Sequence, residues 1–465
     1  MRSSHTVAAV TAVFDDANLI GYGGLEPVVR LAERCGLPDL VGQHLRITGA
    51  ANSGGANPAA KVMSLVAGMA AGADSIDDID RLRHGGMGLL FDGTRAPSTA
   101  GTFLRSFTHG HNRQLHAVHR AFLAELAAAT QLLPGAAQMT FVDIDPSHVR
   151  VYGRAKQGGE YGRLKGKRTL HPLISTISTP HAAPVVGPVR LRSGKAADVR
   201  GAESFVAEAI AVARQAGATG TILVRADSKF YTAEVVAACR RADALFSLST
   251  GINPSITAAI GRIPDSDWVD IVYPHPIEDP DTRQLISAAQ VARIGYTAFV
   301  SRPKRQQVTA WLTVRRVRRE NTQAAQGQDE LFAVYRYHPV FTNNPAPLVA
   351  AEVCHRQHAI VEPTIADLKA SALAHLPSGS FQANNAWLTL AAIAHNLTRA
   401  AGTAASAFHA RAETATIRDQ LIHVPARLAR SARRLVIHLP TAWPWQRAWQ
   451  RLFTAAHAPP TPALT

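Results

Sequence analysis

The sequence has few cysteines and lacks a long apolar run, and each shortage excludes a class of protein. Its three cysteines, Cys35, Cys239 and Cys354, lie far apart, which excludes a disulfide framework and a zinc-finger cluster. Even the alanine-rich stretch 62–73 is shorter than the roughly 18–20 residues that a membrane helix needs. The first residues do not read as an export signal. We therefore expect a cytoplasmic protein without a membrane partner.

Acidic residues are also scarce relative to basic ones. The 465 residues include 34 Asp and Glu against 49 Lys and Arg, a formal charge of +15, and 46% of the residues are apolar. This apolar content is enough for a packed core, and the length allows two to four domains at roughly 150 residues each. A basic protein of this kind typically binds nucleic acid. An anionic membrane surface and an acidic protein are the alternatives.

The spacing of apolar residues divides the chain into regions. Residues 1–135 have helical periodicity at 25–35, 59–71, 75–84 and 113–129, which predicts a helical N-terminal domain. Such a domain either reads DNA or forms a plain helical bundle. Residues 136–250 then alternate between the two element types: strand patterns at 138–144, 148–152, 171–178, 221–224 and 244–249, and helix patterns at 202–216 and 232–241. This mixture predicts an α/β sheet covered by helices.

The second half begins with a change of periodicity. Residues 251–345 alternate with period two at 268–273, 308–317 and 331–337, which predicts a β-rich insert. Helical patterns return at 356–370 and 385–400, so we assign 346–403 to the second part of the α/β core. The remaining residues, 404–465, are expected to form a basic helical segment.

Carboxylates occur at three places where an α/β protein builds sites. Asp143 and Asp145 alternate along a strand and so point to one face of the sheet, and Asp227 follows another strand directly. Glu362 lies on a late helix, two turns before Lys369. Taken singly, each residue suits a turn or a helix cap. Together, three carboxylates in a basic protein fit a site for two divalent cations, Mg²⁺ or Mn²⁺, that transfers phosphoryl groups.

These motifs resemble those of the DDE transposases of bacterial insertion sequences, in particular the insertion-sequence family numbered thirteen-eighty. The first motif, Asp-x-Thr or Asp-x-Ser, is matched by Asp145-Pro146-Ser147, and the second Asp by Asp227 in RADSKFY. Glu362 and Lys369 match the end of the signature Tyr-x2-Arg-x3-Glu-x6-Lys, but His355 and His358 replace its Tyr and Arg. The similarity runs from FDDANLIGYGG near the start to RDQLIHVPARLARSARR near the end.

The resemblance implies a fold and a set of site residues. The fold would be α/β, with a ribonuclease-H-like mixed sheet interrupted by the β-rich insert. Asp145, Asp227 and Glu362 would be the catalytic residues and the ligands of both metal ions, with Asp143 as the alternative first ligand. His355 and His358 put the usual phosphate contacts of the signature in doubt, since histidine is mostly neutral at pH 7. Arg356 could supply the missing positive charge instead.

Basic residues cluster around the three carboxylates. Seven Lys and Arg against Glu160 alone lie between Arg150 and Arg168; they include the predicted DNA contacts Arg150, Arg154, Lys156, Lys165, Lys167 and Arg168. Four more predicted contacts lie in the insert: Arg315, Arg316, Arg318 and Arg319. The alternative is that strand arginines only protect a sheet edge from aggregation. The histidines of HGHNRQLHAVH (residues 109–119) have the density of a metal cluster, but no carboxylate or cysteine set accompanies them, so we expect a structural or DNA-facing role instead.

The sequence thus predicts a transposase that cleaves the ends of an insertion sequence and joins them to target DNA. Its partners would be double-stranded terminal repeats and target DNA near the nucleoid. Two ends must be held together, which suggests a dimer. A nuclease that does not join DNA and an inactive DNA-binding relative are the alternatives.

Overall fold

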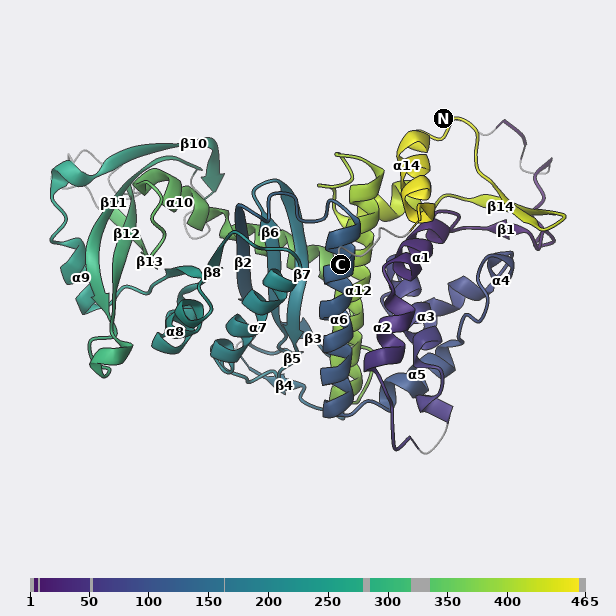
Figure 1. The fold of residues 1–465 in the computed structure, drawn as a ribbon, viewed down its shortest axis with the longest axis horizontal. Coiled ribbons are helices and arrows are strands. Elements are labelled where there is room, and N and C mark those ends of the chain that lie inside the picture. Colours follow the sequence, from purple (N-terminus) through teal and green to yellow (C-terminus); the bar gives the residue numbers. More distant parts are fainter. Residues whose placement is uncertain are drawn as a thin grey trace.

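A computed structural model describes residues 4–6, 9–50, 53–162, 164–278, 285–318 and 335–459. The molecule is elongated, with helices of the N-terminal region at one end, a sheet in the middle and the insert at the other end (Figure 1). In the part of the chain that is described, no helix is both long and apolar enough to cross a membrane.

One nine-stranded mixed sheet organises the molecule, in the order β10-β11-β12-β13-β9-β8-β2-β6-β7. The first strand in the chain to join it, β2 (Met139–Pro146), pairs in parallel with β8 (Thr221–Ala226), which pairs in parallel with β9 (Leu245–Ser249). On the other side of β2, β6 (Leu173–Thr179) and β7 (Ala182–Arg190) are antiparallel. Helix α7 (Ala202–Gln215) leads from β7 to β8, and α8 (Ala233–Arg241) connects the parallel strands β8 and β9. This arrangement is compatible with the expected ribonuclease-H-like core.

The edge strand β7 was not predicted from the sequence, because Pro184 and Pro188 interrupt its pattern. Proline lacks an N–H group and is tolerated at a sheet edge. Between the two prolines, the N–H and C=O of the buried Val186 are both satisfied by the side-chain amide of Asn396, at 2.7 Å each. Asn396 belongs to α12 (Phe381–Ala405), a helix buried on nearly all sides, which closes this edge of the sheet.

The predicted strand at 148–152 was placed in the wrong sheet. The residues form β3 (Val149–Arg150), which belongs with β5 (Arg168–Leu170) and β4 (Glu160–Tyr161) to a separate three-stranded sheet. This small sheet follows Asp145 closely in the chain. We call the segment that forms it, residues 149–170, the basic hairpin.

The insert is continuous with the central sheet. Its strands are β10 (Val269–Glu278), β11 (Leu285–Ala298), β12 (Val308–Arg318) and β13 (Tyr335–Thr342), and β13 pairs antiparallel with β9. A short helix, α9 (Pro254–Ile260), precedes them. The first residues of the predicted strand at 331–337 lie outside the described residues. Arg319 also lies outside them.

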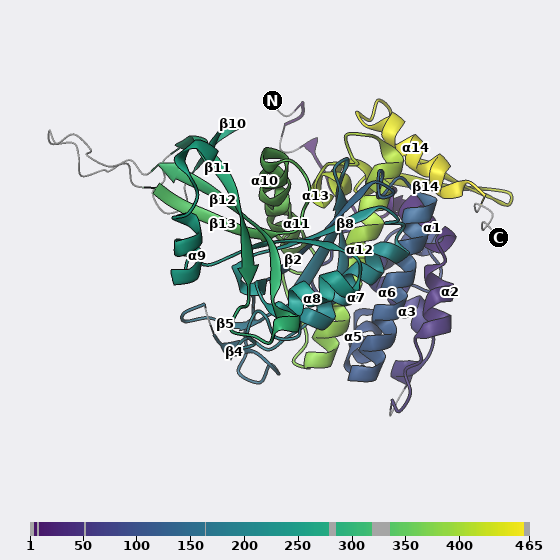
Figure 2. The same cartoon turned by 60° about the vertical axis from the view of Figure 1, so that its left-hand side comes forward.

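The N-terminal region is helical, as the periodicity indicates. It contains α1 (Leu25–Arg34), α2 (Leu37–His44), α3 (Pro58–Ala70), α4 (Met87–Leu90), α5 (Pro97–Arg105) and α6 (His109–Ala129). The helix expected at 75–84 is a 3₁₀ helix, Asp77–Arg83. α6 and α12 lie side by side next to the sheet in both views (Figures 1 and 2).

The prediction of an entirely helical C-terminal segment was wrong. After α13 (Thr414–Ile417), the chain forms a hairpin of β14 (Ala426–Ser431) and β15 (Arg434–His438), and only then α14 (Gln446–His457). Alternation explains the hairpin, since Ala426 and Leu428 are buried while Arg427 is exposed. β14 also pairs with β1 (Leu19–Ile20) from the start of the chain.

Further contacts fix the C-terminal segment onto the N-terminal helices. The backbone N–H groups of Gly23 and Gly24 donate to the carbonyls of Val424 and Ile422, and Arg34 donates to the carbonyl of Ala455 at 2.6 Å. The two ends of the sequence therefore form one structural unit.

Candidate active site

Two neighbouring strands bring Asp145 and Asp227 to the same edge of the sheet. Asp145 is the next-to-last residue of β2, and Asp227 directly follows β8. The strands are parallel, and their last paired residues are Ile144 and Ala226. Both carboxylates thus lie one residue beyond a paired position, where parallel strands commonly build sites.

The third carboxylate comes from a bent helical segment that packs against this region. The single helix expected at 356–370 is divided into α10 (Leu348–Arg356), a 3₁₀ turn (Gln357–Ile360) and α11 (Val361–Lys369). The bend has a cause in the sequence, because Pro363 cannot donate a hydrogen bond to the preceding turn. Glu362 lies in the first turn of α11 and its side chain is exposed.

The electrostatics of Asp145 show that the three carboxylates act on one another. Burial, the charge of Asp227 and, to a smaller extent, that of Glu362 together raise the pKa of Asp145 to about 6, against the lowering effects of His358 and Lys229. Burial lowers the pKa of Lys369, and the charge of Asp145 opposes that change. Asp145 is therefore at the centre of a group of mutually repelling carboxylates, with Lys369 close enough to respond to it.

Asp143, the alternative first ligand, has a different environment. It is fully buried, and both its oxygens accept hydrogen bonds from Arg225, at 2.7 Å each. Arg225 is its partner in the β2–β8 register, also donates to the carbonyl of Cys354 at 2.6 Å, and stacks on Phe141. Burial raises the pKa of Asp143, but Arg225 and then His358 lower it more, so that it falls below the usual value. These contacts leave Asp143 as the anion of a buried ion pair beneath the site.

The two histidines that replace the signature Tyr and Arg also make interior contacts. Nδ1 of His358 lies 2.9 Å from Oδ1 of Asp143. His355 lies between the hydroxyl groups of Ser247 and Ser249, at 2.9 and 3.0 Å, and burial lowers its pKa to about 3. His355 is therefore neutral at physiological pH, and both histidines join the helical segment to the sheet.

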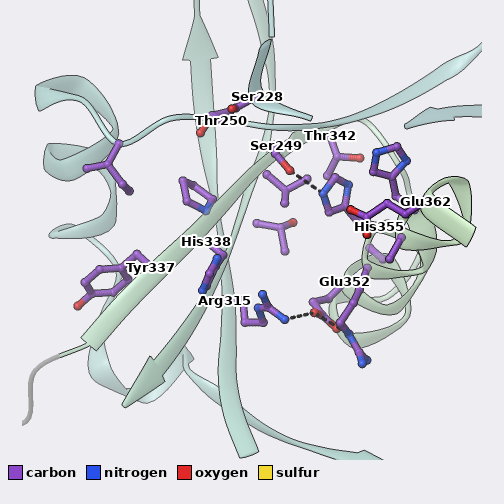
Figure 3. Close-up of a pocket in the computed structure, with 18 residues that line it drawn as sticks. Ser228, Ser249, Thr250, Arg315, Tyr337, His338, Thr342, Glu352, His355 and Glu362 are labelled. Atoms are coloured by element: carbon purple, nitrogen blue, oxygen red, sulfur yellow. Dashed lines mark hydrogen bonds and ion pairs between the residues drawn. The ribbon is translucent and has the colours of Figure 1, made fainter. Parts of the chain in front are cut away.

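A cavity of about 370 Å³ lies between the helical segment and the insert, and Glu362 is the one of the three carboxylates that lines it (Figure 3). Glu362 and His355 line its helical wall, and Arg315, Tyr337 and His338 line the wall formed by β12 and β13. Ser228, the neighbour of Asp227, also borders it. The insert thus contributes directly to the space next to Glu362.

Sequence reasoning missed a chain of charged groups behind Asp227. Nζ of Lys229 lies 3.5 Å from Oδ2 of Asp227 and 3.6 Å from Oδ2 of the buried Asp198, whose Oδ1 lies 3.2 Å from Nε2 of His171. His171 in turn stacks on His148, with ring centroids 4.0 Å apart. The lysine two residues after Asp227 was the available signal, but Asp198 lies on a distant loop that no local pattern connects to it.

The predicted DNA contacts of the basic hairpin fall into two groups. Lys156 donates to the carbonyl of Leu376, and Arg168 to carbonyls of Gly153, Lys156 and Gly159, so both hold the hairpin together. The others are exposed, and Arg150 stacks on Tyr152. Among the described residues, no hydrogen bond or ion pair occupies the side chains of Arg154, Lys165 and Lys167.

The insert arginines that are described also have partners within the protein. Arg315 donates to the hydroxyl of Tyr273 and lies 3.9 Å from Glu352. Arg316 donates to Gln290 and stacks on Trp268 and Tyr335. Arg318 is exposed at the end of β12.

The histidines of residues 109–119 are not brought together as a metal cluster. His111 forms a capping box with Thr108 at the start of α6, whereas His119 is buried against Asn396. Desolvation lowers the pKa of His116 to about 4 and of His119 to about 3. These residues serve the packing of α6.

The donor chemistry of Asp145, Asp227 and Glu362 fits Mg²⁺ or Mn²⁺, since both ions prefer hard carboxylate oxygens. The raised pKa of Asp145 fits as well, because a cation would relieve the repulsion among the three. In the described arrangement, however, no three His, Cys, Asp or Glu side chains are close enough to bind one ion together. Binding of one ion by all three would therefore require the carboxylates to approach one another.

Comparison with known proteins gives an independent result. No curated protein matches the chain. The family model described as transposase DDE domain group 1 matches residues 3–459. Since the match covers nearly the entire sequence, the chain belongs to the DDE transposase domain family.

Proposed function

We propose that the protein is a DNA transposase that cleaves the ends of an insertion sequence and joins them to target DNA by two-metal-ion phosphoryl transfer. The observation that carries the proposal is the mutual influence of Asp145, Asp227 and Glu362, which come from β2, β8 and α11. Membership in the family numbered thirteen-eighty and a ribonuclease-H-like core are part of the same proposal.

In this proposal each carboxylate is a metal ligand, and the surrounding residues hold the ligands in place. Two Mg²⁺ ions, when bound, activate the attacking oxygen and stabilise the leaving oxygen. The ion pair of Asp143 and Arg225, together with His358, fixes β2 against the segment that carries Glu362. Lys369, on the same helix, supplies positive charge near Asp145.

Double-stranded DNA is the proposed partner, and the cytoplasm near the nucleoid the proposed location. The exposed side chains of Arg150, Arg154, Lys165 and Lys167 would contact phosphates next to the site. Lys156 and Arg168 would support the basic hairpin, and Arg315, Arg316, Arg318 and Arg319 would border the DNA from the insert. A dimer would hold two ends in one synaptic complex.

The test uses DNA carrying the element's terminal repeats. Purified protein should cleave these ends in the presence of Mg²⁺ and transfer a pre-cut end to a target plasmid. Asp145→Asn, Asp227→Asn and Glu362→Gln should each abolish both steps, whereas Asp39→Asn on the exposed surface of α2 should not. Cleavage without transfer would identify a nuclease, and binding without either step an inactive relative.

A further inference from the structure

A two-stranded ribbon projects from the end of the molecule opposite the insert. It consists of β14, β15 and the turn between them, residues 426–438, and we call it the basic ribbon. Figures 1 and 2 show it extending beyond the helical body, away from the strands that carry the candidate catalytic residues. Its four arginines are Arg427, Arg430, Arg433 and Arg434, and it contains no acidic residue.

The pairing of the strands separates the ribbon into an attached base and a free tip. Leu428 and Ile437 form a cross-strand pair and pack into the core, which fixes the base to the helical body. From Arg430 to Val436 every residue is exposed, and the tip turns at Ala432, whose φ of 54° is positive. Arg430 lies on the same face of the ribbon as Leu428, and its cross-strand partner is Leu435. Arg434 lies on the opposite face, and its cross-strand partner is Ser431. Arginines therefore extend from both faces of a slim ribbon.

The positive charge of the tip is not balanced within the protein. Arg427, at the base, pairs with Asp16 at 3.1 Å. Among the described residues, no carboxylate pairs with Arg430, Arg433 or Arg434. Like charges this close repel one another, and an external polyanion removes that cost.

The tip also exposes apolar residues, which is typical of a surface that a binding partner covers. Leu435 and Val436 are 39% and 40% exposed, although they lie among arginines. The helix that follows, α14, adds the exposed Arg447 and Arg451, again without an acidic residue. Residues 426–457 thus present six arginines and no carboxylate.

We infer that the basic ribbon binds the phosphate backbone of double-stranded DNA at a distance from the cleavage site. A two-stranded ribbon has the width that the major groove of B-form DNA admits. Arginines on both of its faces can contact the phosphates on either side of that groove. The short side chains of Ala429, Ser431 and Ala432 keep the ribbon narrow enough to approach the duplex. This inference rests on the proposed function for its choice of DNA over other polyanions.

The test replaces the three unpaired arginines of the tip with glutamine, as Arg430→Gln, Arg433→Gln and Arg434→Gln together. Binding to a long duplex is measured across a series of salt concentrations in an Asp145→Asn background, so that cleavage does not interfere. Each lost phosphate contact should reduce the slope of log affinity against log salt by about 0.9, so the slope should fall by about 2–3. At about 0.1 M salt this corresponds to an affinity loss of roughly ten- to several-hundred-fold. The Tm should stay the same or rise, because repulsion is removed.

The matched control removes the same charge elsewhere, as Arg200→Gln, Arg240→Gln and Arg262→Gln. These residues are exposed and have no described ion-pair partner. An equal loss of affinity in both triple variants would show that only net charge matters and would overturn the inference. A ribbon variant that binds duplex like the parent, or a loss confined to anionic phosphatidylglycerol vesicles, would also overturn it.

The two proposals fail in different ways. If the parent protein does not cleave or join DNA but the ribbon variant still loses duplex affinity, the ribbon assignment stands and the transposase mechanism does not. If the parent is active and the ribbon variant binds and cleaves long duplexes equally well, only the ribbon assignment is wrong.

Discussion

The environment of Asp145 predicts that removing its charge stabilises the metal-free protein. The pKa of Asp145 lies at about 6, compared with 3.8 for an exposed aspartate. Each unit of that difference corresponds to about 1.4 kcal/mol, so ionising Asp145 costs the folded state about 3 kcal/mol at pH 8. Asn has nearly the same shape and no charge. We therefore expect Asp145→Asn to raise the free energy of unfolding by about 2–3 kcal/mol at pH 8 in EDTA.

The sign of this effect depends on pH. An acid whose pKa is raised by folding binds its proton more tightly in the folded state, so the cost of its charge sets in as pH rises above 3.8 and is complete above about 6. The advantage of the variant should be largest at pH 8 and fall to about 1 kcal/mol at pH 4.5, where the carboxyl is protonated in the folded protein but still mostly ionised in the unfolded chain. For a chain of 465 residues, the unfolding entropy is about 1 kcal/mol/K, so the expected rise in Tm is about 2–3 °C.

Calorimetry or urea denaturation of wild type, Asp145→Asn and the surface variant Asp39→Asn checks the prediction at both pH values. Mg²⁺ at a hundred times its Kd should then stabilise the wild type by about 2.7 kcal/mol and leave Asp145→Asn unchanged. If Asp145→Asn were no more stable than wild type at pH 8, or if its advantage at pH 4.5 were as large as at pH 8, the raised pKa inferred for Asp145 from its burial and the charge of Asp227 would be refuted.

Three further predictions follow from other parts of the structure. Asp143→Asn should destabilise the protein by about 3–5 kcal/mol in urea denaturation, because Arg225 would remain buried without its anion; a stabilising effect would instead place Asp143 among the repelling carboxylates. The pKa of His355 is about 3 in the folded protein, against an ordinary value of 6.5. The free energy of unfolding should therefore decrease by up to about 1.4 kcal/mol for each pH unit below 6.5. A His355 ring that titrates near pH 6 by NMR would contradict this. Gly24→Ala should lower the free energy of unfolding by about 3 kcal/mol or more, since its Cβ would lie 1.6 Å from a carbonyl oxygen of the C-terminal segment. The measurement is the Tm, and Gly21→Ala, which has open space around it, is the control that should leave the Tm unchanged.

The sequence predicts those parts of the fold that local periodicity specifies. Strands β8 and β9 and helices α7 and α8 alternate clearly, and the structure places them within a few residues of the expected bounds. Strand β7 is hidden by its prolines, which an edge position permits. The C-terminal hairpin escapes prediction because its arginine content resembles that of a solvated helix, whereas the alternation of only a few buried residues selects the strand.

At the candidate site, the residue types could be recognised from motifs, but their environments could not. Asp143 and Asp145 look equivalent on one strand. They differ because the β2–β8 register places Arg225 opposite Asp143, and Arg225 is 82 positions away in the sequence. The Asp198–Lys229 contact likewise depends on a loop whose position only the folded chain determines.

The pairing of β1 with β14, and of Gly23 and Gly24 with residues 422–424, has a consequence for synthesis on the ribosome. The N-terminal helices emerge first, yet they receive these partners only when nearly the whole message has been translated. A prematurely terminated product would leave β1 without its neighbouring strand and α1 without its C-terminal contacts. A nascent polypeptide of this protein therefore completes its N-terminal unit only at the end of translation, which ties the finished fold to an intact reading frame.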